Sequence, residues 1–597
     1  MGVWGRAYLR HLRAYARAFW DWLRHFPPAA WHLLSHLVRT ERRRLLVIVL
    51  ATAVTSLVLA WLGTGGSEIW AIVVTLALGT LVVAVSQEHR TVGTVVVAVM
   101  GLCLVGTLAG PRWHPRPLDT ATVLPTTTDT SIGGAVATVA VGTYQVSTQD
   151  VMIQLDDGAQ APARLRLPVG ASEPLPGVVF MHGAGTHNIE HGFAEQAEAL
   201  ASAGAATLVP TKPERGYSLT ERDYLSMAAG YAHSITYLRT VPGVDAKRVG
   251  IYAESEGAFP GVVATAQDPQ VAFLVLASAP VVRLRQQAAL AADSYLRRVG
   301  APEQLMTIIP RVLGARSLPG GAFGYVDFDA TEYEQHIKVP VLMLYGTNDD
   351  SMPLVQGPYT IWQGLQANGN HKLTVRYYEA ANHGLKLGTK TDGPLAPGVA
   401  RDLSRWVVGL PATASAVPHV AGAQPRQRYW AQTPSPTRWY ASGDLMLGSL
   451  LAGTGLLVAA ALGWLLGQAP RLGGRPGLHL PDPIGRMTVA AGLSVLATWM
   501  LYLAYLAGII HLATSHSTDP LLSYGGLLVA QVAGLGTVII IVRLSQEVWR
   551  RRKDLRAGLA GKRWYTPAAF LVLAAARLGS LILLVDLAYW GLFPLLA

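Results

Sequence analysis

Ser255 lies where the chain could present a nucleophile. It belongs to the segment Ala-Glu-Ser-Glu-Gly at 253–257, which follows the short apolar run 249–252 and precedes an alanine-rich stretch. The apolar run predicts a buried strand. A serine on a tight turn between a strand and a helix exposes its hydroxyl, and the residues two positions before and after it must be small. Ala253 and Gly257 are small, so the segment predicts a nucleophilic serine.

Two further polar segments follow the serine, each at the end of a predicted strand. An apolar run ends in Gly-Thr-Asn-Asp-Asp at 346–350, which places Asp349 and Asp350 in a turn. Both aspartates could instead only cap the helix that follows. His383 lies in a loop after the predicted strand 373–379. Taken alone, a loop histidine is most often a solvated polar residue, but its position after the serine and the aspartates favours a shared role.

These segments together resemble the α/β-hydrolase superfamily over about 150–410 of the chain. The segment 253–257 is similar to its nucleophile elbow, with alanine in place of the usual first glycine. The loop His-Gly-Ala-Gly at 182–185 resembles its His-Gly-x-Gly loop, and 346–353 resembles its Gly-x-x-Asp-x-x-x-Pro turn. The order serine, aspartate, histidine is that of this superfamily. The Ser-Glu-Gly elbow looks like that of some bacterial serine esterases and dienelactone-hydrolase-like enzymes.

The resemblance implies a role for each of these residues. Ser255 would be the nucleophile, His383 the general base, and Asp349, or else its neighbour, the acid that orients the histidine. The backbone N–H groups of Ala184 and Glu256 would form the oxyanion hole. An ordinary strand-ending turn is the alternative interpretation of the glycine-rich loop. Neither a cofactor nor a metal site is expected.

The elements around these residues predict an α/β fold. Predicted strands and helices alternate along 143–410, which favours a mostly parallel sheet covered by helices on both faces. The stretch of about 281–336 interrupts this alternation with helical periodicity, and we expect it to form a helical cap over the serine. The flanking segments 111–142 and 411–443 are rich in proline and small or polar residues, so we expect both to be linkers.

The composition indicates a membrane protein with more than one domain. Of the 597 residues, 51% are hydrophobic and 14% are charged. Seven apolar runs are each long enough to cross a bilayer as a helix. They lie at 45–63, 69–86, 92–110, 444–466, 487–512, 521–543 and 566–594. We therefore expect three transmembrane helices within 45–110 and four within 444–597. The single cysteine, Cys103, lies in the third run, so no disulfide can form within one chain.

The net charge of +11 is concentrated beside the apolar runs. Residues 1–44 hold nine arginines and two acids, and 543–563 hold eight basic residues and two acids. Basic residues mark the cytoplasmic side of a membrane, which predicts a cytoplasmic N-terminus and an extracytoplasmic segment 111–443. Nucleic-acid binding explains this distribution poorly. The 1–44 segment is either an amphipathic helix on the inner leaflet or a cytoplasmic helix that supplies topology charges. The abundance of alanine, glycine and arginine suggests a bacterial chain.

The sequence therefore predicts a membrane-anchored, extracytoplasmic serine hydrolase that cleaves a carboxylic ester of a lipid or of the cell envelope. The alternatives are an acyltransferase that uses the same serine, a peptidase, and a non-catalytic transporter or sensor with a hydrolase-like domain. The last alternative rests on Arg577 and Asp586 in the final apolar run, because intramembrane charges often mark function. The expected partners are the acyl-ester substrate and membrane lipids, and the oligomeric state is left open.

Overall fold

The computed structural model describes residues 90–593, except 112, 135, 157, 186–188, 315–322, 389–392, 471–476 and 554–566. Its contacts divide the chain into two compact units. One unit takes the chain up to Ala109 together with Leu450–Met500 and the chain from Ala530 onward. The other takes Gly110–Ser449 together with Leu501–Val529. The basic segment 1–44 and the first two predicted membrane spans lie outside the described residues.

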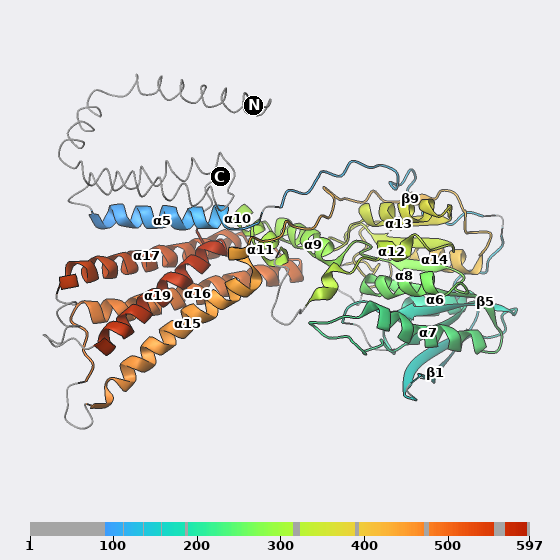
Figure 1. The fold of residues 1–597 in the computed structure, drawn as a ribbon. Coiled ribbons are helices and arrows are strands. Elements are labelled where there is room, and N and C mark those ends of the chain that lie inside the picture. Colours follow the sequence, from blue (N-terminus) through green and yellow to red (C-terminus); the bar gives the residue numbers. More distant parts are fainter. Residues whose placement is uncertain are drawn as a thin grey trace, which may run out of the picture. The chain divides into compact units, whose positions relative to one another are not determined.

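A nine-stranded sheet forms the centre of the second unit (Figure 1). Its order is β1-β2-β4-β3-β5-β6-β7-β8-β9. β1 and β2 pair with each other antiparallel, β2 pairs antiparallel with β4, and every other pairing is parallel. The strands are β1 Val146–Gln154, β2 Gln160–Pro168, β3 Leu175–Met181, β4 Ala206–Pro210, β5 Val244–Glu254, β6 Leu274–Ala277, β7 Val341–Gly346, β8 Leu373–Tyr378 and β9 Val420–Gly422. The sheet is therefore mostly parallel.

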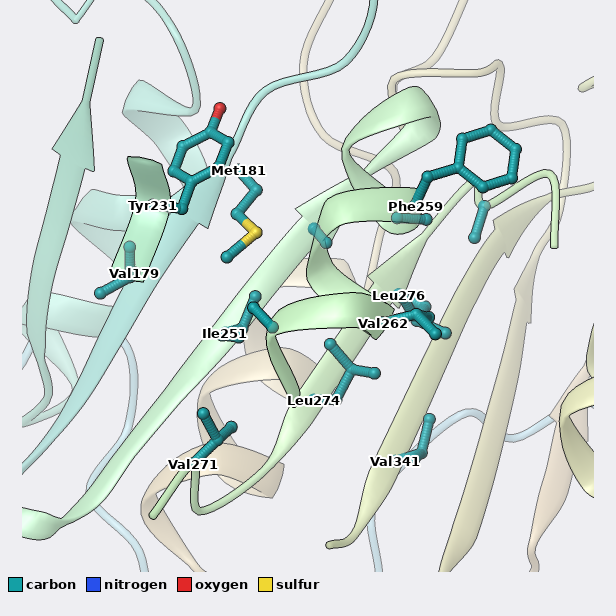
Figure 2. Packing of buried hydrophobic residues seen from close by; sticks show 14 of the residues in the cluster. Val179, Met181, Tyr231, Ile251, Phe259, Val262, Val271, Leu274, Leu276 and Val341 are labelled. Atoms are coloured by element: carbon teal, nitrogen blue, oxygen red, sulfur yellow. The ribbon is translucent and has the colours of Figure 1, made fainter. Parts of the chain in front are cut away.

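Helices cover both faces of this sheet, because its central strands are apolar on both sides. Alternate residues of β3 point to opposite faces, so that Val179 and Met181 enter one core and Val178 and Phe180 the other. Figure 2 shows the first core, which contains residues of α7 and α8. The second core contains residues of α6 and α14. These helices are α6 Ala194–Ser202, α7 Tyr224–Thr240, α8 Ala258–Gln267 and α14 Val399–Val408.

Short helices occupy the chain between β6 and β7, in the region where the sequence predicts a cap. They are α9 Leu284–Arg298, α10 Glu303–Met306, α11 Ile308–Leu313, the 3₁₀ turn η3 Gly324–Asp327 and α12 Thr331–Glu334. The amide of Gln287 on α9 donates a hydrogen bond to the carbonyl of Ser351 at 2.6 Å. α9 therefore contacts the loop that follows β7. On the far side of that loop, α13 Gln356–Ala367 returns along the sheet to β8.

The interpretation of 111–142 and 411–443 as linkers is wrong for parts of both segments. Residues of the second form β9, and the N–H of Gly422 donates to the carbonyl of Thr127 at 2.8 Å. Ile132 of the first is 2% exposed and belongs to the second core. A strand of three residues is too short to give a recognisable alternating pattern, so composition alone could not reveal it.

Five helices among the described residues are long and apolar enough to cross a membrane by length and composition. They are α5 Arg90–Leu108, α15 Gly443–Leu466, α16 Ile484–Ser515, the π-helical turn η6 Leu521–Gly526 continued by α17 Leu527–Arg550, and α19 Pro567–Tyr589. They correspond to the last five predicted spans. α17 ends seven residues beyond the predicted end at 543, because the apolar pattern stops before the helix does.

Glu334 at the end of α12 makes stability depend on pH. Its side chain is 1% exposed, and Oε1 has no hydrogen-bond partner within the described part of the chain. Burial, with a smaller contribution from the charge of Asp329, raises the pKa of Glu334 from 4.5 to about 8. The unfolded chain releases this proton near pH 4.5, while the folded chain keeps it. Folding stability is therefore lost as the pH rises from about 4.5 to about 8.

We expect Glu334→Gln to raise the Tm of the detergent-solubilised protein at pH 8 by about 2–5 °C, and to leave it nearly unchanged at pH 5. Differential scanning fluorimetry at the two pH values measures both effects. Glu332→Gln, at an exposed position of the same helix, is the matched control and should change Tm at neither pH. An equal shift at pH 5 and pH 8 would show that the carboxyl of Glu334 does not titrate as described.

Candidate active site

Ser255 occupies a strained turn between β5 and α8. Its φ of 54° lies in the left-handed region, which costs a non-glycine residue roughly 1–3 kcal/mol. A Cβ at Gly257 would lie 2.5 Å from the carbonyl oxygen of Met181 and 2.8 Å from that of His182, so only glycine fits there. Ala253 is fully buried, and a Cβ at Gly261 of α8 would lie 2.7 Å from its Cβ. Close packing of the helix on the strand therefore requires small residues around the serine.

The structure brings Ser255, His383 and Asp349 into one hydrogen-bonded chain. The Oγ of Ser255 lies 2.8 Å from Nε2 of His383, and Nδ1 of His383 lies 2.7 Å from Oδ2 of Asp349. The three residues follow β5, β8 and β7, which run parallel, so all three lie at the same edge of the sheet. Asp350 instead forms an ion pair with Arg298 of α9. Of the two adjacent aspartates, only Asp349 contacts the histidine.

In this hydrogen-bonded series, His383 and Asp349 each stabilise the charged form of the other. Burial on its own lowers the pKa of His383, but the charge and hydrogen bond of Asp349, and the charge of Glu254, outweigh burial and raise the pKa to about 9. Burial on its own raises the pKa of Asp349, but the charge of His383 and hydrogen bonds from His383 and Ser351 lower it below its usual value. Asp349 is therefore a carboxylate that stabilises the imidazolium form of His383.

The pH dependence of kcat/KM should depend on the pKa of His383, which both Asp349 and Glu254, the residue before the serine, raise. Only the neutral imidazole can accept the serine proton, so we expect kcat/KM to rise with pH as His383 loses its proton near pH 9. Glu254→Gln removes a charge that raises the pKa of His383, and the rise should therefore move to lower pH. Ester hydrolysis measured from pH 5 to 10 gives both curves. Glu303→Gln, whose side chain is 79% exposed, should reproduce the wild-type curve, and an unmoved Glu254→Gln curve would contradict the coupling.

The glycine-rich loop after β3 lies directly against the serine. A Cβ at Gly183 would be 3.0 Å from the Cβ of Ser255 and 3.6 Å from its Oγ. The preceding His182 is fully buried, and its Nε2 donates to the carbonyl of Pro210 at 2.8 Å, which selects the tautomer protonated at Nε2. Its backbone N–H bonds to the hydroxyl of Tyr231 at 3.0 Å. His182 thus anchors the loop to its neighbours, and the exposed Ala184 lies one residue beyond Gly183.

Glu256 directly follows the serine and lies at the centre of a buried polar cluster. Its side chain is 3% exposed. Lys212 lies 3.2 Å from Oε2, and Arg222 pairs with Oε1. The hydroxyls of Tyr217 and Tyr224 each donate to the carboxylate at 2.9 Å. Burial on its own raises the pKa of Glu256, but the charges of Lys212 and Arg222 outweigh burial and lower it, so this residue is a carboxylate.

Lys212 links this cluster to the glycine-rich loop. Its ammonium is fully buried and donates to the carbonyl of Gly183 at 2.7 Å as well as to Glu256. One buried cation therefore contacts both segments that carry the expected oxyanion donors, the loop with Ala184 and the turn with Glu256.

The sequence analysis did not identify Lys212 or Arg222. One signal was present, because a glutamate that is buried beside the serine needs a basic partner. Lys212 follows β4 by two residues, at the strand end where such a partner could lie.

The described residues contain no group of three or more histidine, cysteine, aspartate or glutamate side chains that could hold a metal ion, and this includes the surroundings of His182 and His191.

Part of this domain is similar to a known family model. Residues 231–388 match the family model described as BAAT / Acyl-CoA thioester hydrolase C terminal. The matched residues include Ser255, Asp349 and His383, whereas Ala184 and Lys212 lie before them. No curated protein matches the chain.

Several solved structures are similar to the domain. DcsB in complex with its substrate analogue is 17% identical, with a TM-score of 0.31, and the match covers 44% of this chain and 100% of that one. A dienelactone hydrolase of Anabaena variabilis is 18% identical, with a TM-score of 0.29 and coverage of 45% and 97%. An esterase of Pyrococcus furiosus is 16% identical, with a TM-score of 0.29 and coverage of 45% and 92%.

The sheet order, the strained serine turn after β5 and the family match at 231–388 agree with one another. The chain carries an α/β-hydrolase domain, with apolar helices before and after it in the sequence.

Proposed function

We propose that this domain is a serine hydrolase that cleaves a carboxylic acyl ester through an acyl-enzyme on Ser255. The observation that carries the proposal is the hydrogen-bonded chain from the Oγ of Ser255 through His383 to Asp349, with distances of 2.8 and 2.7 Å. The nucleophile lies within hydrogen-bond reach of the base, and the base within reach of the orienting acid, as nucleophilic catalysis by serine requires.

His383 accepts and returns the proton at each step of this mechanism. The Oγ of Ser255 attacks the carbonyl carbon while its proton passes to Nε2 of His383, and Asp349 stabilises the imidazolium that forms. The tetrahedral intermediate collapses as the C–O bond to the leaving alcohol breaks, and that alcohol takes the proton from His383. Water then attacks the acyl-enzyme while its proton passes to the same nitrogen. The bond from the acyl carbon to Oγ breaks, His383 returns the proton to Oγ, and the acid and the free serine are released.

The oxyanion of each tetrahedral intermediate would be held by the N–H groups of Ala184 and Glu256. Lys212 supports the first donor, because the carbonyl of Gly183 and the N–H of Ala184 belong to one planar trans peptide and point in opposite directions. The hydrogen bond from Lys212 to that carbonyl, at 2.7 Å, thus turns the Ala184 N–H away from Lys212. The ammonium also fixes the Glu256 side chain at 3.2 Å, so we propose Lys212 as the residue that positions both donors.

The membrane helices support a lipid or cell-envelope ester as the substrate. Five described helices are long and apolar enough to span a bilayer, which would keep the domain near acyl esters of the membrane. The distribution of basic residues beside the spans supports an extracytoplasmic position of the domain.

Competing substrates test the proposed function. The full chain in detergent should hydrolyse p-nitrophenyl esters, and a panel of increasing acyl length identifies the preferred chain. Acyl-CoA thioesters are the second arm, because the family match includes thioester hydrolases by name. A product that forms only when an acceptor alcohol or amine is added would assign acyl transfer instead of hydrolysis. Absence of turnover and of labelling by a fluorophosphonate at Ser255 would refute the proposed function.

A further inference from the structure

A cavity of about 650 Å³ lies among three of the apolar helices, apart from the hydrolase domain in sequence. It is formed by residues of α5, α17 and α19, and all of its described lining residues belong to the first unit. The lining residues are Thr94, Ala98, Leu102, Val538, Ile541, Val542, Ser545, Gln546, Trp549, Arg550, Arg577, Leu581, Leu584 and Val585. The volume falls within the range of about 300–1,000 Å³ typical of small-molecule sites.

Hydrogen bonds align the polar lining residues at one end of this cavity. The side chain of Gln546 on α17 bonds to the hydroxyl of Thr91 on α5 at 2.9 Å and to that of Thr94 at 3.4 Å. The guanidinium of Arg577 on α19 donates to the hydroxyl of Ser545 at 3.3 Å. Trp549 and Arg550 follow within the next turn and a half of α17. Hydroxyl, amide and guanidinium groups thus meet at one level of the three helices, and Trp549 and Arg550 continue the polar end along α17.

The other end of the cavity is apolar. Going along each helix away from this polar level, the lining residues become exclusively apolar: Ala98 and Leu102 on α5, Val538, Ile541 and Val542 on α17, and Leu581, Leu584 and Val585 on α19. Ser545 and Val538 are seven residues apart, which is roughly 10 Å along a helix. The cavity therefore has the polarity of an amphiphile, with a polar head region and an apolar tail region.

The head region is cationic. Among its described lining residues, two are arginines and none is an aspartate or a glutamate. Arg550 pairs with Glu547 of its own helix at 3.7 Å. Arg577 is half-buried, and in the described part of the chain no carboxylate lies within 4.0 Å of it. A guanidinium among apolar helices is costly unless an anion or a polar partner compensates its charge. Its one described hydrogen bond is to a neutral hydroxyl.

We propose that this cavity binds an anionic phospholipid, with its phosphate at Arg577 and Arg550 and one acyl chain along the apolar end. The two arginines favour an anionic head group, since guanidinium groups bind phosphate oxygens through several N–H donors. The apolar end favours a ligand with an acyl chain over a free inorganic anion. This site is separate from the proposed hydrolase chemistry and does not depend on it.

Native mass spectrometry of the full chain in detergent tests the proposal, with phosphatidylglycerol and phosphatidylcholine of identical acyl chains as probes. We expect phosphatidylglycerol to bind at least tenfold more tightly, and Arg577→Gln to abolish that preference. Arg543→Gln is the matched control, because Arg543 is an exposed arginine on α17 that does not line the cavity. The control should retain wild-type binding.

Two further arms keep the proposal testable if Arg577→Gln fails to fold. Ala98→Phe fills the apolar end and leaves both arginines in place, so it should weaken the binding of phosphatidylglycerol at least tenfold. Inorganic phosphate at millimolar concentration should not displace the lipid, because it lacks the tail. Equal binding of the two lipids, equal losses in Arg577→Gln and Arg543→Gln, or displacement by phosphate alone would each overturn the proposal.

Discussion

Ser255→Ala is expected to lower kcat for ester hydrolysis by about 10⁴–10⁶-fold, because the proposed acyl-enzyme forms on the Oγ that this substitution removes. The serine hydroxyl lies 2.8 Å from Nε2 of His383, which can accept its proton as the oxygen bonds to the acyl carbon. Fold and substrate binding should persist, since the change removes one oxygen at a position where the strained turn remains. Initial rates with a short p-nitrophenyl ester, together with labelling by a fluorophosphonate, measure the effect.

A second serine-to-alanine substitution separates loss of the proposed nucleophile from the general effect of removing a serine hydroxyl. Ser278 directly follows β6, is fully buried and also has a positive φ of 46°. Ser278→Ala should keep activity within about threefold of wild type, as expected for a residue outside the transition state. Persistent hydrolysis or labelling in Ser255→Ala would remove Ser255 from the mechanism, and the proposed function would fail with it.

Lys212→Met is expected to lower kcat by about 10²–10³-fold with little change in KM, the usual effect of losing one oxyanion donor. The substitution removes the hydrogen bond to the carbonyl of Gly183, and the peptide that carries the Ala184 N–H is then free to rotate. It does not leave Glu256 as an uncompensated buried charge, because Arg222 still pairs with that carboxylate. Rates measured across substrate concentrations separate kcat from KM.

Arg222→Met is the control for Lys212→Met. Arg222 shares the partner Glu256, and no described hydrogen bond joins it to the Gly183 carbonyl. Its loss should cost less than about tenfold in kcat if orientation of the Gly183–Ala184 peptide is what matters. The pH at which kcat/KM rises should be unchanged in Lys212→Met, because the change acts on the oxyanion and not on His383. Equal losses in both variants, or a shifted pH profile, would assign Lys212 a merely structural role.

Much of the hydrolase domain could be predicted from local patterns. Short apolar runs that end in Gly, Asp or Ser gave the strands around Ser255 and Asp349 within a few residues, and the apolar runs after residue 90 gave the five described membrane-length helices. Such patterns are readable because strand alternation and helix length are set by neighbouring residues along the chain. Glu334 shows the limit, since nothing in its local sequence indicates that it is buried without a partner for Oε1 among the described residues.

The sequence by itself determined which residues could do chemistry, in which order, and beside which apolar segments. Only the tertiary structure decided how they meet. In the structure Asp349 contacts His383, whereas Asp350 pairs with Arg298. Lys212 lies between Gly183 and Glu256, which are 73 residues apart in the sequence. The structure also brought Arg577 next to Ser545. The physical reason is that these contacts join strand ends and helix faces far apart in sequence, and their distances depend on the packing of the whole unit rather than on any local pattern.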